Sequence, residues 1–224
     1  MKLSIKVQNI TNSIKRSFER FPVTILTSTA VVILLIILSE MELKFTPDER
    51  DKFIRFTMTV ALGIPLSACI KVLFEKVKDV KGLLITVGYL IGASLLVLYY
   101  LLFLKDLNWI STVRYVGISL FLYLAFFYIP WIKKKDGYEY YIIDILFNFI
   151  ITAVYSFVLF LGIVIIIFTI VQLFNVDIPD KFVYYSFLII SGIFAPSIFL
   201  AKIPELKGES YTIESPKSLK VLLL

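Results

Sequence analysis

Four polar residues share one face of the longest apolar stretch in the chain. Asp144, Asn148, Thr152 and Tyr155 follow one another at intervals of four, four and three residues, which aligns them on a helix. One hypothesis is that this row lines a cavity in which Asp144 binds a cation or a proton at the mouth. The alternative, which we favour, is that these groups form hydrogen bonds between packed helices.

Two arginines are the other candidates for chemistry inside an apolar segment. Arg55 and Arg114 each fall about one helical turn inside the end of such a segment. Long basic side chains at this depth extend to the membrane surface at modest cost, and this is the interpretation that we favour. The alternative is an anion site on the outer side, for which Glu40, Glu42 and Asp51 are competing internal partners.

The residue inventory disfavours most familiar membrane enzymes. The chain has no histidine, which removes imidazole bases, histidine metal ligands and histidine haem ligands together. Its single cysteine, Cys69, lies inside an apolar run, so no disulfide can form within the chain. Phosphate-binding loops, metal-ligand clusters and nucleophile elbows are absent from the sequence. We therefore expect no catalytic residue, no metal and no cofactor, and we expect that the protein is not an enzyme.

The composition identifies the class of protein that must position these residues. Of 224 residues, 59% are hydrophobic and only 18% are charged, which is typical of a polytopic membrane protein. The predicted fold is all-α. Residues 1–21 are expected to form a basic amphipathic helix on the membrane surface, residues 22–201 a bundle of six transmembrane helices, and residues 202–224 a cytoplasmic tail with the start of a further helix.

The predicted spans differ in length and in their boundary signals. Thr46 and Glu49 flank Pro47 in the pattern of a capping box, so the second helix should begin there. Residues 145–176 hold no charged residue, and a helix of that length exceeds the roughly 30 Å hydrocarbon core of a bilayer. The apolar segments are 23–38, 53–74, 82–104, 109–132, 144–176 and 182–200, and the helix that contains 53–74 starts outside the membrane at Pro47.

Small residues and prolines within the spans predict local features of helix packing. Pro65 and Pro196 should kink their helices, because each removes one backbone hydrogen bond. Gly88 and Gly92 form a G-x-x-x-G pattern, which lets two helices approach closely. We expect this pattern to serve packing within one protomer; a homo-oligomer contact and no special role remain as alternatives.

The distribution of positive charge predicts the orientation in the membrane. Most of the 23 lysines and arginines lie before residue 22, in 71–81, in 133–135 and after residue 200. The opposite connections hold only Lys44, Arg50, Lys52, Lys105 and Lys181. Because positive residues near short loops remain in the cytoplasm, both termini should be cytoplasmic. The same basic segments are expected to face anionic lipid headgroups rather than nucleic acid.

The second half of the chain resembles a known family. The residues that carry the resemblance are VYSFVLFLGIVIIIFTIVQLFNVDIP, then IFAPSIFLAKIPE and PKSLKVLLL, together with the basic segment leading into Arg20-Phe21-Pro22. They resemble the bacterial polytopic membrane proteins called domain of unknown function 4153. The resemblance implies an all-α membrane fold in the bacterial cytoplasmic (inner) membrane, with further spans after this segment. It implies no activity and no catalytic residues.

Two classes of function follow from these observations. The first is a non-enzymatic membrane module for sensing, assembly or partner binding, which engages lipid, a second copy of the chain or another membrane protein. The second is a transporter or channel for a small solute that uses the polar face of the fifth span. An uninterrupted fifth span favours the first class, because carriers commonly break helices at their substrate site.

Overall fold

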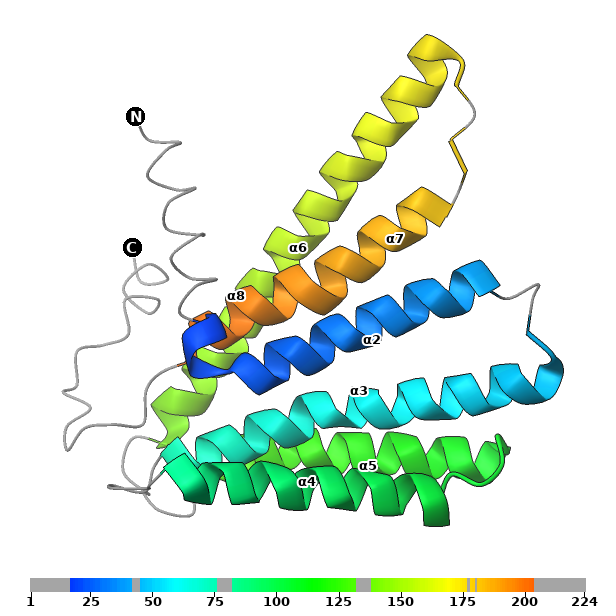
Figure 1. Ribbon diagram of the computed structural model, residues 1–224. Helices are drawn as coiled ribbons and strands as arrows, with labels where there is room; N and C mark the ends of the chain where they lie inside the picture. Colours follow the sequence, from blue (N-terminus) through cyan, green and yellow to red (C-terminus); the bar gives the residue numbers. More distant parts are fainter. Residues whose placement is uncertain are drawn as a thin grey trace, which may run out of the picture. The chain divides into compact units, whose positions relative to one another are not determined.

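The computed structural model describes residues 17–41, 45–75, 82–131, 138–176, 178–179 and 181–203. Regular structure in these ranges is helical, without strands, and six of the described helical segments are long and apolar enough to cross a membrane. The all-α prediction is thus confirmed, whereas nearly all of the basic N-terminal segment and of the C-terminal tail lies outside the described residues. In chain order (Figure 1) the elements are α2 (Pro22–Met41), α3 (Pro47–Glu75), α4 (Gly82–Leu102), α5 (Trp109–Tyr128), α6 (Tyr138–Phe174), α7 (Lys181–Ile189), the π-helix η2 (Ile190–Phe194) and α8 (Ala195–Ala201).

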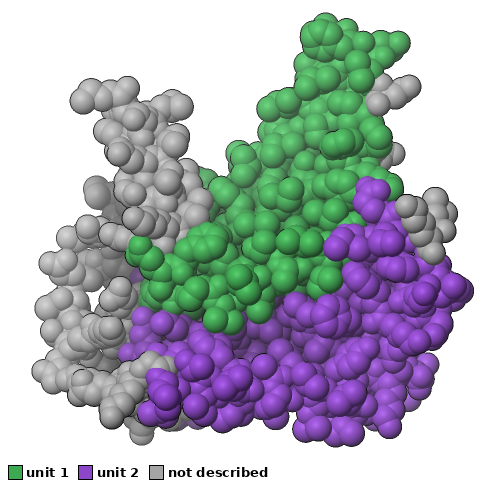
Figure 2. Space-filling model, viewed as in Figure 1, with its two compact units in different colours: residues 1–36, 146–203 green, residues 37–145, 204–224 purple. Residues whose placement is uncertain are grey.

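The chain divides into two compact units, coloured separately in Figure 2. Unit 1 comprises residues 1–36 and 146–203, and so contains most of α2, most of α6 and the sixth span formed by α7, η2 and α8. Unit 2 comprises residues 37–145 and 204–224, and so contains α3, α4, α5 and the first turns of α6.

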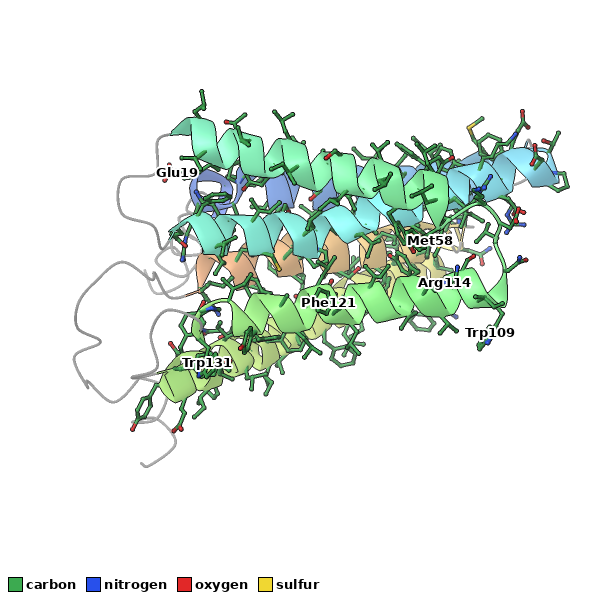
Figure 3. The ribbon with its side chains drawn as sticks, turned by 90° about the horizontal axis from the view of Figure 1, so that it is seen from below. Glu19, Met58, Trp109, Arg114, Phe121 and Trp131 are labelled. Atoms are coloured by element: carbon green, nitrogen blue, oxygen red, sulfur yellow. The ribbon has the colours of Figure 1, made fainter. Side chains whose placement is uncertain are left out.

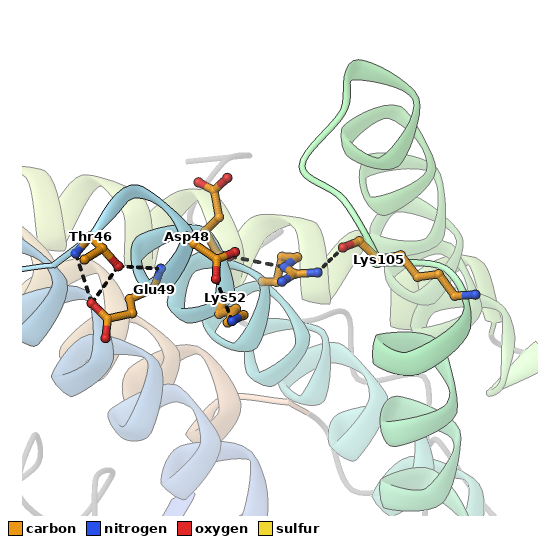
Figure 4. A network of polar contacts seen from close by, with 7 residues as sticks. Thr46, Asp48, Glu49, Lys52 and Lys105 are labelled. Atoms are coloured by element: carbon orange, nitrogen blue, oxygen red, sulfur yellow. Dashed lines mark hydrogen bonds and ion pairs between the residues drawn. The ribbon is translucent and has the colours of Figure 1, made fainter.

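In unit 2, α3 begins at the capping box that the sequence predicts. The backbone N–H of Thr46 donates to Oε2 of Glu49 over 3.0 Å, and the N–H of Glu49 donates back to the Thr46 hydroxyl over 3.4 Å (Figure 4). Lys52 forms an ion pair with Asp48 over 2.7 Å on the exposed side of the same turn. This pair contributes little, because both side chains are in contact with solvent.

The interior of unit 2 forms where α3 packs against α4 and α5. Its buried centre contains Leu62, Tyr99 and Leu104. Gly88 and Gly92 of α4 lie against α3: a Cβ atom added at Gly92 would lie 2.7 Å from Cδ1 of Ile70. The G-x-x-x-G face therefore contacts a helix of the same protomer. The apolar residues packed around this centre are Met58, Leu96, Tyr115, Ile118 and Leu122.

Pro65 lies inside α3, which the structure describes as one continuous helix from Pro47 to Glu75. The thiol of Cys69, one turn further on, donates to the carbonyl oxygen of Leu122 on α5 over 3.3 Å. Pro65 and Cys69 are buried, and so are the neighbouring small residues Gly63 and Ser67. This part of α3 is therefore the packing face of unit 2.

The longest helix, α6, begins earlier than the sequence predicts. It starts at Tyr138 and runs for 37 residues, so Asp144 lies in its second turn rather than at its entrance. The aromatic and apolar residues of Tyr138–Ile143 explain the difference, because they extend the helical apolar pattern backwards past Asp144. The helix ends at Phe174, and Asn175 follows with a φ of 50°, a left-handed conformation that asparagine tolerates at helix ends.

In unit 1, the sixth span contains a π-helical segment before Pro196, where the sequence predicts only a kink. The N–H of Ala195 donates to the carbonyl oxygen of Ile190, five residues earlier. Pro196 has no N–H, so the carbonyl oxygen of Gly192 loses its donor in the α-helical pattern. The hydroxyl of Ser28 on α2 donates to this oxygen instead. Helix α2 therefore completes the backbone hydrogen bonding of the interrupted span.

Close packing accompanies this hydrogen bond between α2 and the sixth span. A Cβ atom added at Gly192 would overlap Cγ2 of Val32, one turn after Ser28 on α2. Valine has little freedom at χ1, so it cannot readily turn away from an added methyl group. Val32 and Ser28 are both buried. Gly192 is therefore the residue that permits the two helices to approach.

We expect Gly192→Ala to destabilise the protein by about 1–3 kcal/mol, because the added methyl group overpacks the contact with Val32. The midpoint of thermal unfolding of the purified protein in detergent measures this effect. Gly162→Ala on α6 is the control, since among the described residues nothing lies within 4 Å of its Cβ position. In a Val32→Ala background the cost of Gly192→Ala should fall by at least half; an undiminished cost contradicts the proposed contact.

Candidate functional site

Two members of the predicted polar row of α6, Asn148 and Thr152, face the interior of unit 1. The side-chain amide of Asn148 donates to the carbonyl oxygen of Lys202 at the end of the sixth span over 3.3 Å. Thr152 is 3% exposed and Ser156 is 9% exposed. Tyr155, by contrast, is 59% exposed and lies on another side of the helix. The buried row therefore continues from Thr152 to Ser156.

Sequence reasoning missed Ser156, although the signal was present. The interval of four residues that joins Asn148 to Thr152 leads directly to Ser156, whereas Tyr155 turns away from the line of the row. The first predicted member of the row, Asp144, is half-buried in the part of α6 that belongs to unit 2, where it has an interaction partner. The structure thus brings Asn148 and Thr152 together with Ser156 on the buried face of unit 1.

Basic residues surround the end of the sixth span in unit 1. The ammonium group of Lys202 lies 5.4 Å from the ring centre of Tyr155, a distance that allows a cation–π contact. Burial lowers the pKa of Lys202 below the usual value for lysine. Arg20 donates to the carbonyl oxygen of Ile203, and Ser17 donates to that of Ser197. These contacts attach the segment before α2 to the end of α8.

The aromatic contacts of unit 1 give the alignment of α6 with the sixth span. Phe149 contacts Phe199 with ring centres 6.0 Å apart, and Phe160 contacts Phe187 with ring centres 5.6 Å apart. The two segments are therefore antiparallel, as Figure 1 also shows. Thr152 and Ser156 lie between the two aromatic contacts on α6, and η2 with Pro196 lies between them on the other segment.

In unit 2, Arg55 occupies a defined position at the turn between α4 and α5. Its Nη1 donates to the carbonyl oxygen of Leu104 over 3.2 Å and also to that of Lys105. Its Nε donates to the carbonyl oxygen of Asp51 over 3.3 Å. The guanidinium group therefore satisfies carbonyl oxygens just after the end of α4 and ties this turn to α3.

Arg114 has a different environment from Arg55. It is exposed on α5, near the end marked by Trp109 and far from the end marked by Trp131 (Figure 3). An exposed guanidinium group near the end of a span can extend toward the membrane surface. The two arginines thus differ in role: backbone carbonyl oxygens hold Arg55, whereas Arg114 is available at the surface of unit 2.

The chemistry that the site in unit 1 can perform follows from its donor atoms. The buried row offers one amide, two hydroxyl groups and nearby backbone carbonyl oxygens, all of which form neutral hydrogen bonds. Among the residues that the structure describes, no group of three or more His, Cys, Asp or Glu side chains is placed to hold a metal ion. The arrangement suits helix packing and the binding of small uncharged polar molecules.

The different environments of the two arginines generate a prediction. Arg55→Ala should destabilise the protein by about 1–3 kcal/mol, because it leaves the carbonyl oxygens at the α4–α5 turn without a donor. Arg114→Ala, the matched control, should change stability by less than about 0.5 kcal/mol. Chemical or thermal unfolding of both variants in detergent measures the difference. Equal effects of the two substitutions are incompatible with the capping role of Arg55.

Comparison of the chain with protein-family models, with curated proteins and with solved structures gives no match. The resemblance to the domain of unknown function 4153 family stays a prediction from the residues that carry it.

Proposed function

We propose that this protein is a non-enzymatic membrane module for sensing, assembly or partner binding. The observation that carries the proposal is the use made of polar side chains in the described helices. Ser28, Asn148 and Arg55 each donate to a backbone carbonyl oxygen of another segment in their own unit. Such contacts join helices to one another, whereas a catalytic site requires polar groups that converge on a reacting atom.

The exposed surfaces of the spans support a role in contact with lipid or with other membrane proteins. Large apolar side chains cover the outside of α4, α5 and α6, with Trp109 81% exposed and Leu83 75% exposed. In a bilayer these faces contact acyl chains, a second copy of the chain or a partner helix. The 37 residues of α6 span roughly 55 Å, which exceeds the roughly 30 Å hydrocarbon core. One end of α6 is therefore available outside the bilayer core.

The proposed setting is the bacterial cytoplasmic membrane with both termini in the cytoplasm. The distribution of lysine and arginine between the connections supports this orientation. The basic N-terminal segment would then lie against anionic lipid headgroups, to which each lysine or arginine contributes about 1 kcal/mol near the surface. Lys202 and Arg20, at the end of the sixth span, belong to the same basic side.

A second candidate function is a transporter or channel for a small solute. One observation favours it: the sixth span is interrupted by η2 opposite the buried row of α6. Interrupted helices commonly form substrate sites in carriers, and π-helical segments are frequent at functional sites. The proposal of a non-enzymatic module is nevertheless preferred, because the described polar groups mainly join helices.

The two candidates make different predictions for Asp144 and Asn148. If the row serves packing, Asn148→Leu should destabilise the protein by about 1 kcal/mol, because the carbonyl oxygen of Lys202 loses its donor. Asp144→Asn should change stability by less than about 0.5 kcal/mol, since the amide keeps its capacity for hydrogen bonding. Thermal unfolding in detergent measures both effects.

Reconstituted vesicles distinguish the module from the transporter. Vesicles that contain the protein and a trapped pH-sensitive dye should show no proton flux above that of protein-free vesicles. A flux that Asp144→Asn abolishes, without loss of thermal stability, contradicts the module and favours the transporter. The Asn148→Leu variant controls for loss of folding in the same assay.

The proposed orientation can be tested by labelling in intact cells. Single cysteines at Lys44 and at Asp106 should react with a membrane-impermeant thiol reagent from outside, whereas a cysteine at Lys134 should not. All variants carry Cys69→Ala, although the native thiol is buried and engaged with Leu122. Labelling at position 134 in intact cells is the result that overturns the six-span orientation.

A further inference from the structure

Two hydroxyl groups in unit 1, those of Thr152 and Ser156, differ from many serine and threonine hydroxyl groups on the described spans. Thr27, Thr57 and Thr169 each donate to a carbonyl oxygen three or four residues earlier in their own helix, as hydroxyl groups in apolar helices commonly do. The hydroxyl groups of Thr152 and Ser156 are buried and have no hydrogen-bond partner among the residues that the structure describes. A buried hydroxyl group without a partner destabilises the folded protein.

Both hydroxyl groups face the sixth span. On α6, Asn148 and Phe149 contact the sixth span at one end, and Phe160 contacts it at the other. Thr152 follows Asn148 by four residues and Ser156 precedes Phe160 by four, so both lie on the same helical face as these contacts. The side chains are therefore directed toward the part of the sixth span that lies between Phe187 and Phe199.

The sixth span has unused acceptor capacity at this level. Pro196 offers no N–H, so the carbonyl oxygen that this residue would serve, that of Ser191 in a π-helical register or that of Gly192 in an α-helical one, lacks that donor. Ser28 supplies one donor to Gly192 from α2. Each carbonyl oxygen accepts up to two hydrogen bonds. Acceptors on the sixth span thus lie level with the two hydroxyl groups on α6.

The chemistry of these groups selects the kind of ligand. Two hydroxyl groups and a carbonyl oxygen supply the two to four polar partners that a buried water molecule requires. A sodium ion also binds hydroxyl and carbonyl oxygens, but its charge is costly in an apolar interior without a carboxylate to balance it. The donor set of Asn148, Thr152 and Ser156 is neutral, which favours a neutral ligand.

We propose that Thr152 and Ser156, together with a backbone carbonyl oxygen at the Pro196 interruption, form a buried water-binding site between α6 and the interrupted sixth span. Water accepts a hydrogen bond from each hydroxyl group and donates to a carbonyl oxygen of the interruption that has acceptor capacity left. The site stabilises the π-helical segment from the α6 side, as Ser28 does from the α2 side. This inference concerns only the interior of unit 1 and does not rest on the proposed function.

The sign of a stability change tests the proposal. Thr152→Val keeps the branched shape of the side chain and replaces the hydroxyl group by a methyl group. If the hydroxyl group binds water, the midpoint of thermal unfolding in detergent should fall by about 2–4 °C. If the hydroxyl group is dry and without a partner, its removal should leave the midpoint unchanged or raise it, which overturns the proposal. Thr169→Val on the exposed side of α6 is the matched control.

A double substitution tests whether the two hydroxyl groups share one site. Thr152→Val combined with Ser156→Ala should lower the midpoint by less than the two single substitutions together, because the second change removes a ligand from a site already lost. Additive effects contradict a shared site.

Sodium chloride and choline chloride at equal ionic strength should give the same midpoint of thermal unfolding for the wild-type protein. Stabilisation by sodium that both substitutions abolish would identify a cation site and overturn the assignment of water.

Radiolytic labelling gives a second measurement that does not depend on the stability of the variants. Brief X-ray exposure converts bound water to hydroxyl radicals, which oxidise adjacent side chains. Phe160, a half-buried residue one turn after Ser156 on α6, should be oxidised in the wild-type protein, and the double variant should lose at least half of this oxidation. Phe168, exposed on the same helix, serves as the control. Equal oxidation of the wild-type protein and the variant contradicts the proposal.

Discussion

Every carbonyl oxygen at a helix end or a helix interruption needs a donor, and in an apolar environment the donor must come from the protein or from bound water. This constraint explains the main polar contacts of both units. Ser28 supplies the donor at Gly192, Asn148 at Lys202 and Arg55 at Leu104. Each contact joins two segments, so the requirement of the backbone also determines which helices are tied together.

The same constraint connects the proposed function with the proposed water site. Polar side chains that already donate hydrogen bonds to backbone carbonyl oxygens hold helices together. This use supports the proposal of a module whose role is contact with lipid or with partners. Thr152 and Ser156 are exceptions, because they are buried without a partner in the described part of the chain and face the interruption at Pro196. Hydration of these groups would satisfy the backbone of the sixth span on the side that Ser28 does not reach.

Several features could be predicted from single residues because their causes are local. The capping box of Thr46 and Glu49 depends on residues within one turn, and it forms as predicted. The start of α6 could not be placed in the same way. A charged residue such as Asp144 usually marks the end of a span, but here the helix continues through it for six residues toward Tyr138. The fourth member of the polar row was misassigned to Tyr155 instead of Ser156. Intervals of three and of four residues both keep a side chain near one face of a helix, so the spacing alone does not choose between them.

By itself, the sequence determined that the chain is all-α, with six apolar segments long enough to cross a membrane, because hydrophobicity and length act on each helix separately. Only the tertiary structure decided which residues meet. The donor that Ser28 supplies at Gly192, the contact of Gly192 with Val32 and the carbonyl partners of Arg55 after α4 all join residues that are distant in sequence. They depend on how two helices approach, and the spacing of residues within one helix carries no information on that approach.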